Sequence, residues 1–155
     1  KDVDSTKQRK NITILELGTY CGYSSILIAT LLDEMGLLHN NDDGGDEKHS
    51  ATNVSFYSVE VVESNAQVAK KLIKLAGFED FIHVLRFDPF KESLTTYLKR
   101  EMLLLDPHND TLDIDFLFID HDKDLYLPDL QELETSGWIR EGCFVAADNV
   151  VFAKI

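Results

Sequence analysis

The sequence has few features of a secreted or membrane-spanning protein. Only two of its 155 residues are cysteines, Cys21 and Cys143, and they form no CxxC pair or other zinc-binding spacing. No apolar run approaches the roughly 20 residues that a helix needs to cross a bilayer. The first residues also lack the pattern of a signal peptide. We therefore expect two reduced thiols in a cytoplasmic protein.

Positive charge is also scarce. The chain has 15 lysine and arginine residues against 28 aspartate and glutamate residues, which gives a formal net charge of −13. A protein that binds nucleic acid needs a clustered basic surface to neutralise phosphates, and anionic membranes also attract basic surfaces. The sequence contains no basic run, so we expect neither nucleic acid nor a membrane as a partner. It does not indicate the oligomeric state.

Short apolar runs alternate with helical segments along the chain, whose apolar fraction of 44% is typical of a globular protein. Five runs are predicted as strands: residues 12–17, 54–61, 81–87, 114–119 and 143–147. Four segments between them are predicted as helices: residues 24–32, 64–76, 91–104 and 125–136. Ser24 or Ser25 is expected to cap the first helix. This alternation predicts an α/β fold built from βαβ units, with a mostly parallel sheet and helices on both faces.

One segment interrupts the alternation. Residues 39–53 are polar, acidic and rich in glycine, which is typical of a solvated loop inserted between two elements. No linker divides the chain, so residues 1–155 are predicted to form a single domain. The chain stops seven residues after Asp148, where an open sheet would normally continue with another helix or strand. We therefore expect the domain to be partial and to extend beyond this segment at both ends.

Carboxylates lie at the ends of four of the five predicted strands: Glu16, Glu60, Asp120 and Asp148. In open parallel sheets, ligands bind outside the carboxyl ends of the strands. A carboxylate at the end of a buried strand is costly unless it faces a ligand, a metal ion or water. Four carboxylates at the same edge therefore indicate a binding site there.

The turn after the first predicted strand reads Glu16-Leu-Gly18-Thr-Tyr-Cys-Gly22. It lacks the third glycine of a dinucleotide-binding turn and the lysine of a P-loop, so it is poorly suited to phosphates. An acid two residues before Gly18 favours a cationic ligand instead. Glu60 is placed to accept hydrogen bonds from ribose hydroxyls. A nucleoside with a positive end and no phosphate describes S-adenosylmethionine.

A second cluster combines Asp120-His-Asp-Lys123 with Asp148-Asn149. Two carboxylates and an amide oxygen suit Mg²⁺, which prefers oxygen ligands. Lys123 lies three residues after Asp120 and can reach the same space. A neighbouring cation lowers the pKa of a lysine, which suits a general base. The alternative for Lys123 is a solvated surface amine.

Read in order, these residues resemble the catechol O-methyltransferase family. The likeness covers about residues 14–150 and rests on three motifs: Glu16-Leu-Gly-Thr-Tyr-Cys-Gly-Tyr-Ser24, Asp120-His-Asp-Lys-Asp-Leu-Tyr-Leu-Pro-Asp129 and Ala147-Asp-Asn-Val150. The resemblance implies a Rossmann-like S-adenosylmethionine methyltransferase fold, with the last strands of the sheet missing from this segment. It also implies that N-terminal helices that help to cover the donor precede Lys1.

Carried over residue by residue, the resemblance implies a donor site and a metal site. The residues implied to bind S-adenosylmethionine, including its ribose at Glu60, are Glu16, Gly18, Tyr20, Ser24, Glu60 and Asp120. The residues implied to hold Mg²⁺ are Asp120, Asp148 and Asn149. Lys123 is implied to be the catalytic base that deprotonates a hydroxyl of the substrate.

Two positions depart from the family pattern. Asp122 replaces a tryptophan, and the resulting Asp-x-Asp-Lys is similar to the caffeoyl-CoA O-methyltransferases. Phe87-Asp-Pro-Phe90 replaces the Gly-Ala-Ser-Gln turn that follows the third strand in the family. There Asp88 is expected to accept a hydrogen bond from the adenine amino group.

The leading hypothesis is a Mg²⁺-dependent O-methyltransferase that moves a methyl group from S-adenosylmethionine to a hydroxyl of a catechol-like small molecule. Transfer would proceed by direct displacement, without a covalent enzyme intermediate. One alternative is a catalytically impaired module that binds S-adenosylmethionine or a partner, and another is an enzyme of the caffeoyl-CoA type. A nicotinamide-dependent dehydrogenase is disfavoured by the missing third glycine.

Overall fold

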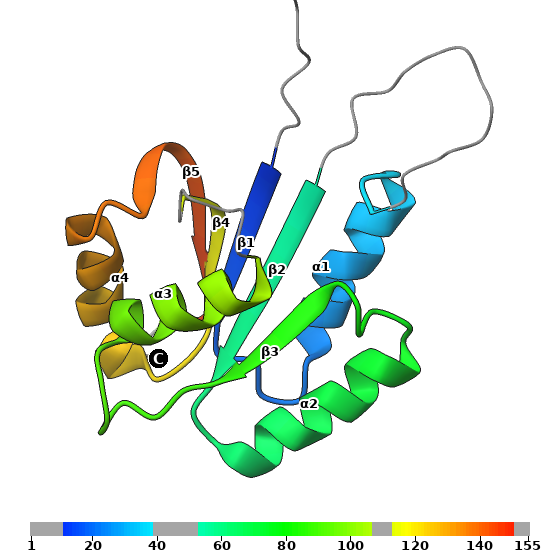
Figure 1. Cartoon of the computed structure of the whole chain (residues 1–155), viewed down its shortest axis with the longest axis horizontal. Coiled ribbons are helices and arrows are strands. Elements are labelled where there is room, and N and C mark those ends of the chain that lie inside the picture. Colours follow the sequence, from blue (N-terminus) through cyan, green and yellow to red (C-terminus); the bar gives the residue numbers. More distant parts are fainter. Residues whose placement is uncertain (1–10, 39–52, 107–112, 151–155) are drawn as a thin grey trace, which may run out of the picture.

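The computed structural model of the chain describes residues 11–38, 53–106 and 113–150, in which strands and helices alternate (Figure 1). The strands are β1 (Asn11–Leu17), β2 (Asn53–Glu60), β3 (Ile82–Arg86), β4 (Ile114–Ile119) and β5 (Ile139–Ala147). The helices are α1 (Tyr23–Glu34), α2 (Glu63–Leu75), α3 (Leu94–Leu105) and α4 (Tyr126–Thr135), and a short 3-10 helix, η1 (Lys123–Leu125), precedes α4. The predicted α/β class is therefore confirmed.

The five strands form one sheet in the order β3-β2-β1-β4-β5, and every pairing is parallel. The chain moves outward from β1 to β3 and then crosses to the other side of β1 to form β4 and β5. In open parallel sheets, ligands bind where the strand order changes direction, outside the carboxyl ends of the strands. In this sheet that point lies between β1 and β4.

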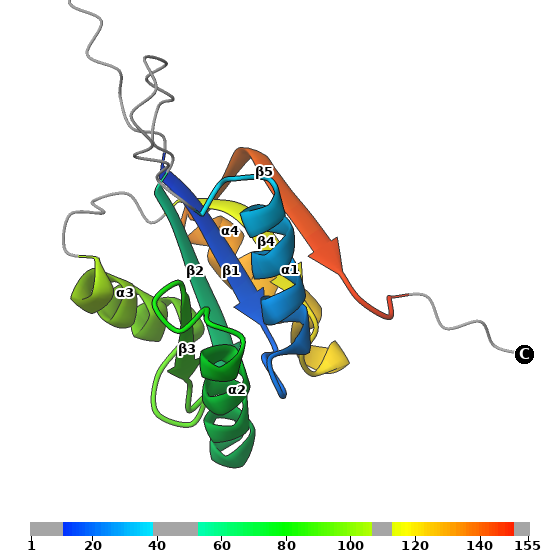
Figure 2. The same cartoon turned by 90° about the vertical axis from the view of Figure 1, so that its right-hand side faces the viewer.

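Helices cover both faces of the sheet, as the sequence predicts (Figures 1 and 2). Helices α1 and α2 pack on one face, and α3 and α4 pack on the other. Successive residues of a strand point to opposite faces, so Leu15 lies in the core under α3 and α4 whereas Ile14 lies under α1 and α2. Glu16, two residues after Ile14, therefore points toward α1.

Local sequence explains how the helices begin and pack. Helix α2 buries Ala66, Ala69 and Ile73, which recur every three or four residues and so share one face. Helix α3 begins after Ser93, whose hydroxyl accepts a hydrogen bond from the backbone N–H of Thr96 at 3.4 Å. The apolar spacing that predicted these helices thus coincides with the faces that they bury.

Two predicted details of the elements are wrong. Helix α1 begins after Gly22, which has a left-handed φ of 85°, and no side chain caps the helix. The hydroxyls of Ser24 and Ser25 donate hydrogen bonds to Glu16 instead. Strand β5 begins at Ile139, four residues earlier than predicted. The prediction missed these residues because those that follow Ile139 on this edge strand are polar and exposed, so they lack the apolar pattern of a buried strand.

Part of the predicted loop at residues 39–53 cannot be compared with the structure. Residues 39–52 lie outside the described residues, and Asn53 begins β2. Within the described ranges, no helix has the length and apolar character required to span a membrane.

The packing predicts a large loss of stability for Leu117→Ala. Leu117 lies on β4 and is fully buried in the core under α3 and α4, so its truncation leaves a cavity. Such substitutions lower the free energy of unfolding by about 2–5 kcal/mol. The matched substitution Leu75→Ala, at the end of α2 where the side chain is 84% exposed, should change it by less than about 0.5 kcal/mol. Urea denaturation of both variants checks this, and equal losses would contradict it.

Candidate functional site

The turn after β1 passes directly against the backbone that follows β4. Gly18 has a φ of +105°, and a Cβ atom at this position would lie 2.4 Å from the carbonyl oxygen of Asp120. No residue with a side chain fits there. The backbone N–H groups of Gly18 and Thr19 both donate to the carbonyl oxygen of Val59, at 3.0 and 3.1 Å. The turn is therefore fixed against β2 and β4, the two neighbours of β1.

Three hydroxyl groups surround the carboxylate of Glu16. The Glu16 side chain is fully buried at the end of β1. The hydroxyls of Ser24, Ser25 and Ser58 donate hydrogen bonds to it, that of Ser24 at 2.5 Å. Removal from water raises the pKa of Glu16, and the three hydrogen bonds oppose this rise. The carboxylate thereby joins β1 to β2 and to the first turn of α1.

A second carboxylate, that of Glu60 at the end of β2, holds the other side of the turn. One of its oxygens accepts a hydrogen bond from the backbone N–H of Tyr20 at 2.7 Å, and the other accepts one from Val62 at 2.7 Å. Tyr20 has a left-handed φ of 47°, which is uncommon for a residue with a side chain. The hydrogen bond that the Tyr20 N–H donates to Glu60 stabilises this conformation. Each carboxylate oxygen retains a lone pair that could accept a further hydrogen bond.

A cavity of about 420 Å³ opens beside the carboxylate of Glu60, at the carboxyl ends of the central strands. Six acidic residues line it, and the described residues of its lining include no lysine or arginine. The acidic residues are Glu60, Glu92, Asp120, Asp122, Asp129 and Glu132. Apolar side chains complete the wall, among them Leu17, Val59, Phe87, Pro89 and Leu125. Arg100 pairs with Glu92 and Lys123 pairs with Asp120, so part of this charge is balanced. The lining as a whole still disfavours phosphate and suits a ligand that combines an apolar body with positive charge.

Four of the residues predicted to bind the donor line this cavity: Gly18, Tyr20, Glu60 and Asp120. The other three do not belong to its lining. Glu16 and Ser24 lie on the side of the turn away from the cavity, where the Ser24 hydroxyl donates a hydrogen bond to Glu16. Asp88 accepts a hydrogen bond from the backbone N–H of Phe90 at 3.2 Å. Direct contacts of these three side chains with a donor stay predictions. The structure shows a different role for Glu16, which fixes the turn through its hydrogen bonds with the serine hydroxyls of α1 and β2.

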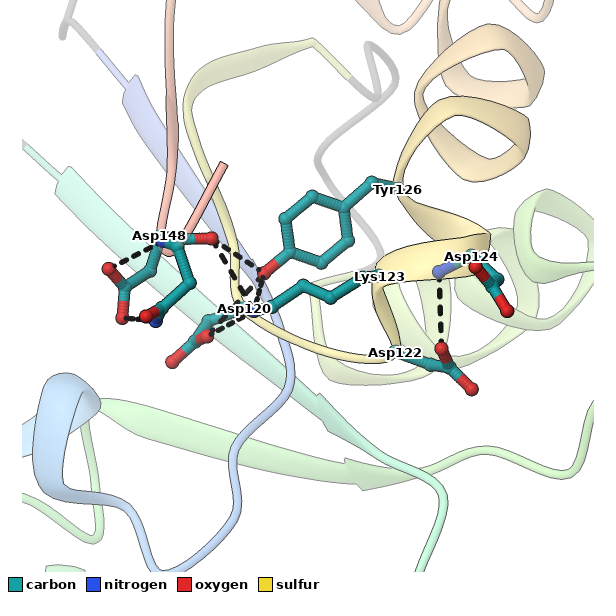
Figure 3. Close-up of polar contacts among 7 residues, drawn as sticks. Asp120, Asp122, Lys123, Asp124, Tyr126 and Asp148 are labelled. Carbon is teal, nitrogen blue, oxygen red and sulfur yellow. Dashed lines mark hydrogen bonds and ion pairs between the residues drawn. The ribbon is translucent and has the colours of Figure 1, made fainter. Parts of the chain in front are cut away.

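The second predicted cluster gathers at the ends of β4 and β5 (Figure 3). The Nζ atom of Lys123 lies 3.4 Å from a carboxylate oxygen of Asp120 and 3.4 Å from the carbonyl oxygen of Asp148. It donates its shortest hydrogen bond, of 2.6 Å, to the hydroxyl of Tyr126. The bonds to Tyr126 and Asp120 raise the pKa of Lys123. The lowering of this pKa that is expected beside a bound cation stays a prediction.

The proposed metal ligands follow the ends of two neighbouring strands, β4 and β5. Ile119 of β4 pairs with Ala147 of β5, and Asp120 and Asp148 are the residues that directly follow them. The carboxylate of Asp148 accepts hydrogen bonds from the backbone and side chain of Asn149, at 2.8 and 2.5 Å. Among the described residues, no three acidic, histidine or cysteine side chains form a group that could hold a metal ion. The oxygen ligands suit Mg²⁺ chemically, so the metal site stays a prediction.

A family model described as "Methyltransferase domain" matches residues 15–150, from β1 to the end of this cluster. The chain belongs to this methyltransferase family. The fold and the motif order that the sequence predicts are therefore confirmed at the level of the family.

Named relatives resemble the chain over most of its length. The chain is 35% identical over 137 residues to a probable O-methyltransferase of Mycobacterium tuberculosis, covering 88% of this chain and 48% of that protein. It is 31% identical over 150 residues to catechol O-methyltransferase of Sus scrofa, covering 96% and 66%. A solved O-methyltransferase of Bacillus cereus, in complex with S-adenosylhomocysteine, matches with a TM-score of 0.56 and 27% identity, covering 90% and 50%. The chain spans about half to two thirds of the length of these relatives.

Sequence reasoning missed several residues of the methyltransferase site. Ser25 and Ser58 hold Glu16, Tyr126 contacts Lys123, and Phe87 lines the cavity. The only sequence signal for Tyr126 is its position three residues after Lys123, which places both side chains on one side of a helical turn. Ser58 carries no such signal because it lies 42 residues from Glu16.

The raised pKa of Glu16 predicts a specific pH dependence of stability. A carboxyl group whose pKa is raised by folding stabilises the native state most below its unfolded pKa, near 4.5, and loses that contribution as the pH rises through its folded value. We expect the free energy of unfolding of the wild type, relative to Glu16→Gln, to be highest in acid and to fall on the way to neutral pH. Denaturant titrations between pH 4 and 8 measure this difference. A difference that does not change with pH would contradict the burial of a titrating Glu16.

Proposed function

We propose that this methyltransferase moves a methyl group from S-adenosylmethionine to a hydroxyl oxygen of a catechol-like small molecule, in the presence of Mg²⁺. The observation that carries the proposal is the acid-lined cavity at the carboxyl ends of β1, β2 and β4. A sulfonium ion suits such a lining, whereas the phosphates of a dinucleotide do not.

The parts of the donor can be matched to the lining by their chemistry. Glu60 has lone pairs that would accept hydrogen bonds from ribose hydroxyls, because its two backbone contacts leave each oxygen partly free. Phe87 and Pro89 offer an apolar wall to adenine. Gly18 lines the cavity, where the methionine part would pass beside the turn. The solved Bacillus cereus relative, in complex with S-adenosylhomocysteine, supports a donor of this class.

In the proposed reaction, an oxygen of the acceptor attacks the sulfonium methyl carbon and the carbon–sulfur bond breaks. The products are a methyl ether and S-adenosylhomocysteine, and the proton of the acceptor hydroxyl would pass to Lys123 in its neutral amine form, the form in which a lysine acts as a base. Asp120, Asp148 and Asn149 would hold Mg²⁺, which lowers the pKa of a hydroxyl group bound to it. The chain itself contributes orientation, since the turn at Gly18 and the end of β4 bring the donor side and the acceptor side together.

A module that binds the donor without catalysis is the second candidate. It is favoured by the side-chain arrangement of the acidic cluster: Lys123 is held by Tyr126 and Asp120, and the carboxylate of Asp148 bonds Asn149. The first candidate function could also act on an acceptor of the caffeoyl-CoA type, because Asp122 gives the chain the Asp-x-Asp-Lys sequence of those enzymes. Its phosphates would have to lie outside the acid-lined cavity.

Donor affinity should fall in Glu60→Gln. An amide cannot accept hydrogen bonds at both positions, so the backbone N–H of Tyr20 or of Val62 loses its partner, and the proposed hydrogen bonds from ribose to the charged oxygens are weakened. Loss of a hydrogen bond to a charged group costs about 1.5–3 kcal/mol, or about 10- to 100-fold in affinity. Calorimetry with S-adenosylhomocysteine on the complete protein measures this. The control Glu34→Gln, at the exposed end of α1, should bind as the wild type does, and equal affinity of both variants would contradict the role of Glu60.

Methyl transfer should depend on a divalent cation. With the complete protein, S-adenosylmethionine and a catechol, we expect transfer to stop when EDTA removes Mg²⁺, and to stop in Asp148→Ala, which removes a proposed ligand. S-adenosylhomocysteine binding should persist in Asp148→Ala, since Asp148 does not belong to the cavity lining. Transfer that survives chelation unchanged would contradict the metal. Donor binding with no turnover of any catechol in Mg²⁺ would favour the non-catalytic module.

A further inference from the structure

We propose that Tyr126 is a positioning residue that holds the amine of Lys123 between the ends of β4 and β5. This inference rests on the proposed function, in which Lys123 meets the acceptor hydroxyl. Tyr126 does not line the donor cavity, so its role would be to place another side chain.

The hydroxyl of Tyr126 forms the closest contact of the Lys123 amine. The Nζ–Oη distance is 2.6 Å, whereas the Nζ atom lies 3.4 Å from both Asp120 and the carbonyl oxygen of Asp148. Lys123 itself is an exposed residue in the three-residue helix η1. A lysine side chain loses several rotatable torsions when it is held in one place. The phenol is therefore the main restraint on where this amine lies.

Tyr126 also connects the amine to the neighbouring strand. A phenol has one hydrogen to donate, and the shorter of its two acceptor contacts is with the carbonyl oxygen of Asp148, at 3.1 Å, against 3.5 Å for Asp120. The hydroxyl thus accepts from Lys123 and donates to the backbone at the end of β5. Figure 3 shows the phenol and the lysine reaching the same space beside Asp120 and Asp148. One side chain therefore links the two loops that carry the proposed metal ligands.

The ring of Tyr126 is held firmly enough for this role. It stacks on the imidazole of His121 with ring centroids 5.1 Å apart and planes 28° apart. The imidazole in turn contacts Asp129 on α4, with its Nε2 atom 2.9 Å from a carboxylate oxygen. The Nζ atom of Lys123 lies 4.7 Å from the centre of the Tyr126 ring. Tyr126 is half-buried and packs against the core under α3 and α4, so a fixed ring supports a flexible amine.

The substitution Tyr126→Phe tests the hydroxyl alone, because phenylalanine lacks the hydroxyl but keeps a ring that can stack on His121. On the complete protein with Mg²⁺, S-adenosylmethionine and a catechol, we expect kcat to fall about 10- to 100-fold. The KM for donor, the affinity for S-adenosylhomocysteine and the Tm should stay close to those of the wild type. The control Tyr23→Phe changes an exposed tyrosine of α1 outside the site and should leave all four quantities unchanged.

A double-mutant cycle tests whether the hydroxyl acts through Lys123. In a Lys123→Ala background, Tyr126→Phe should have no further effect on kcat. A full kcat in Tyr126→Phe, or the same loss in both backgrounds, would overturn the proposal.

Chemical labelling keeps the proposal testable if the proposed function fails. Wild-type protein that transfers no methyl group would contradict the function but not the position of the amine. We therefore also expect an amine-acylating reagent to label Lys123 several-fold faster in Tyr126→Phe, because the amine is released from its hydrogen bond. Peptide mass spectrometry measures the rate, with the exposed Lys99 of α3 as the internal control. Equal labelling of Lys123 in both proteins would overturn the positioning role whether or not transfer occurs.

Discussion

The buried carboxylate of Glu16 is the contact on which the arrangement of the site depends. It is fully removed from water, and an unpaired carboxylate in such a place would destabilise the fold. Three hydroxyls compensate for the lost water, from two positions at the start of α1 and one on β2. These hydrogen bonds require β1, β2 and α1 to meet in one arrangement, so the turn between β1 and α1 is held in one path. The close approach of Gly18 to Asp120 follows from that path.

In the proposed function, the site divides into a donor side and an acceptor side that share Asp120. On the donor side, Glu60 fixes the turn and faces an acid-lined cavity. On the acceptor side, Tyr126 and Lys123 join the ends of β4 and β5. Negative charge therefore has two different tasks in this chain. Buried carboxylates order the backbone, and those that line the cavity favour a cationic ligand.

The sequence predicted best what depends on short-range pattern. The apolar run at residues 114–119 coincides with β4, and the carboxylates at the strand ends pointed to the edge of the sheet at which the cavity lies. Prediction from the sequence failed where one residue type can either cap a helix or form a tertiary hydrogen bond. Ser24 and Ser25 have the features of helix caps, but they bond Glu16, because the tertiary fold also brings Ser58 to that carboxylate. The contact of Tyr126 with the end of β5 is likewise tertiary, and no local pattern encodes it.

The most direct test of the central claim is the choice of ligand by the acid-lined cavity. Isothermal titration of the complete protein with S-adenosylmethionine and with NAD, under identical conditions, compares a cationic nucleoside with an anionic dinucleotide. The structure predicts binding of S-adenosylmethionine at one site per chain and no measurable binding of NAD. Comparable affinity for both, or binding of NAD alone, would contradict the assignment of this cavity to a cationic methyl donor.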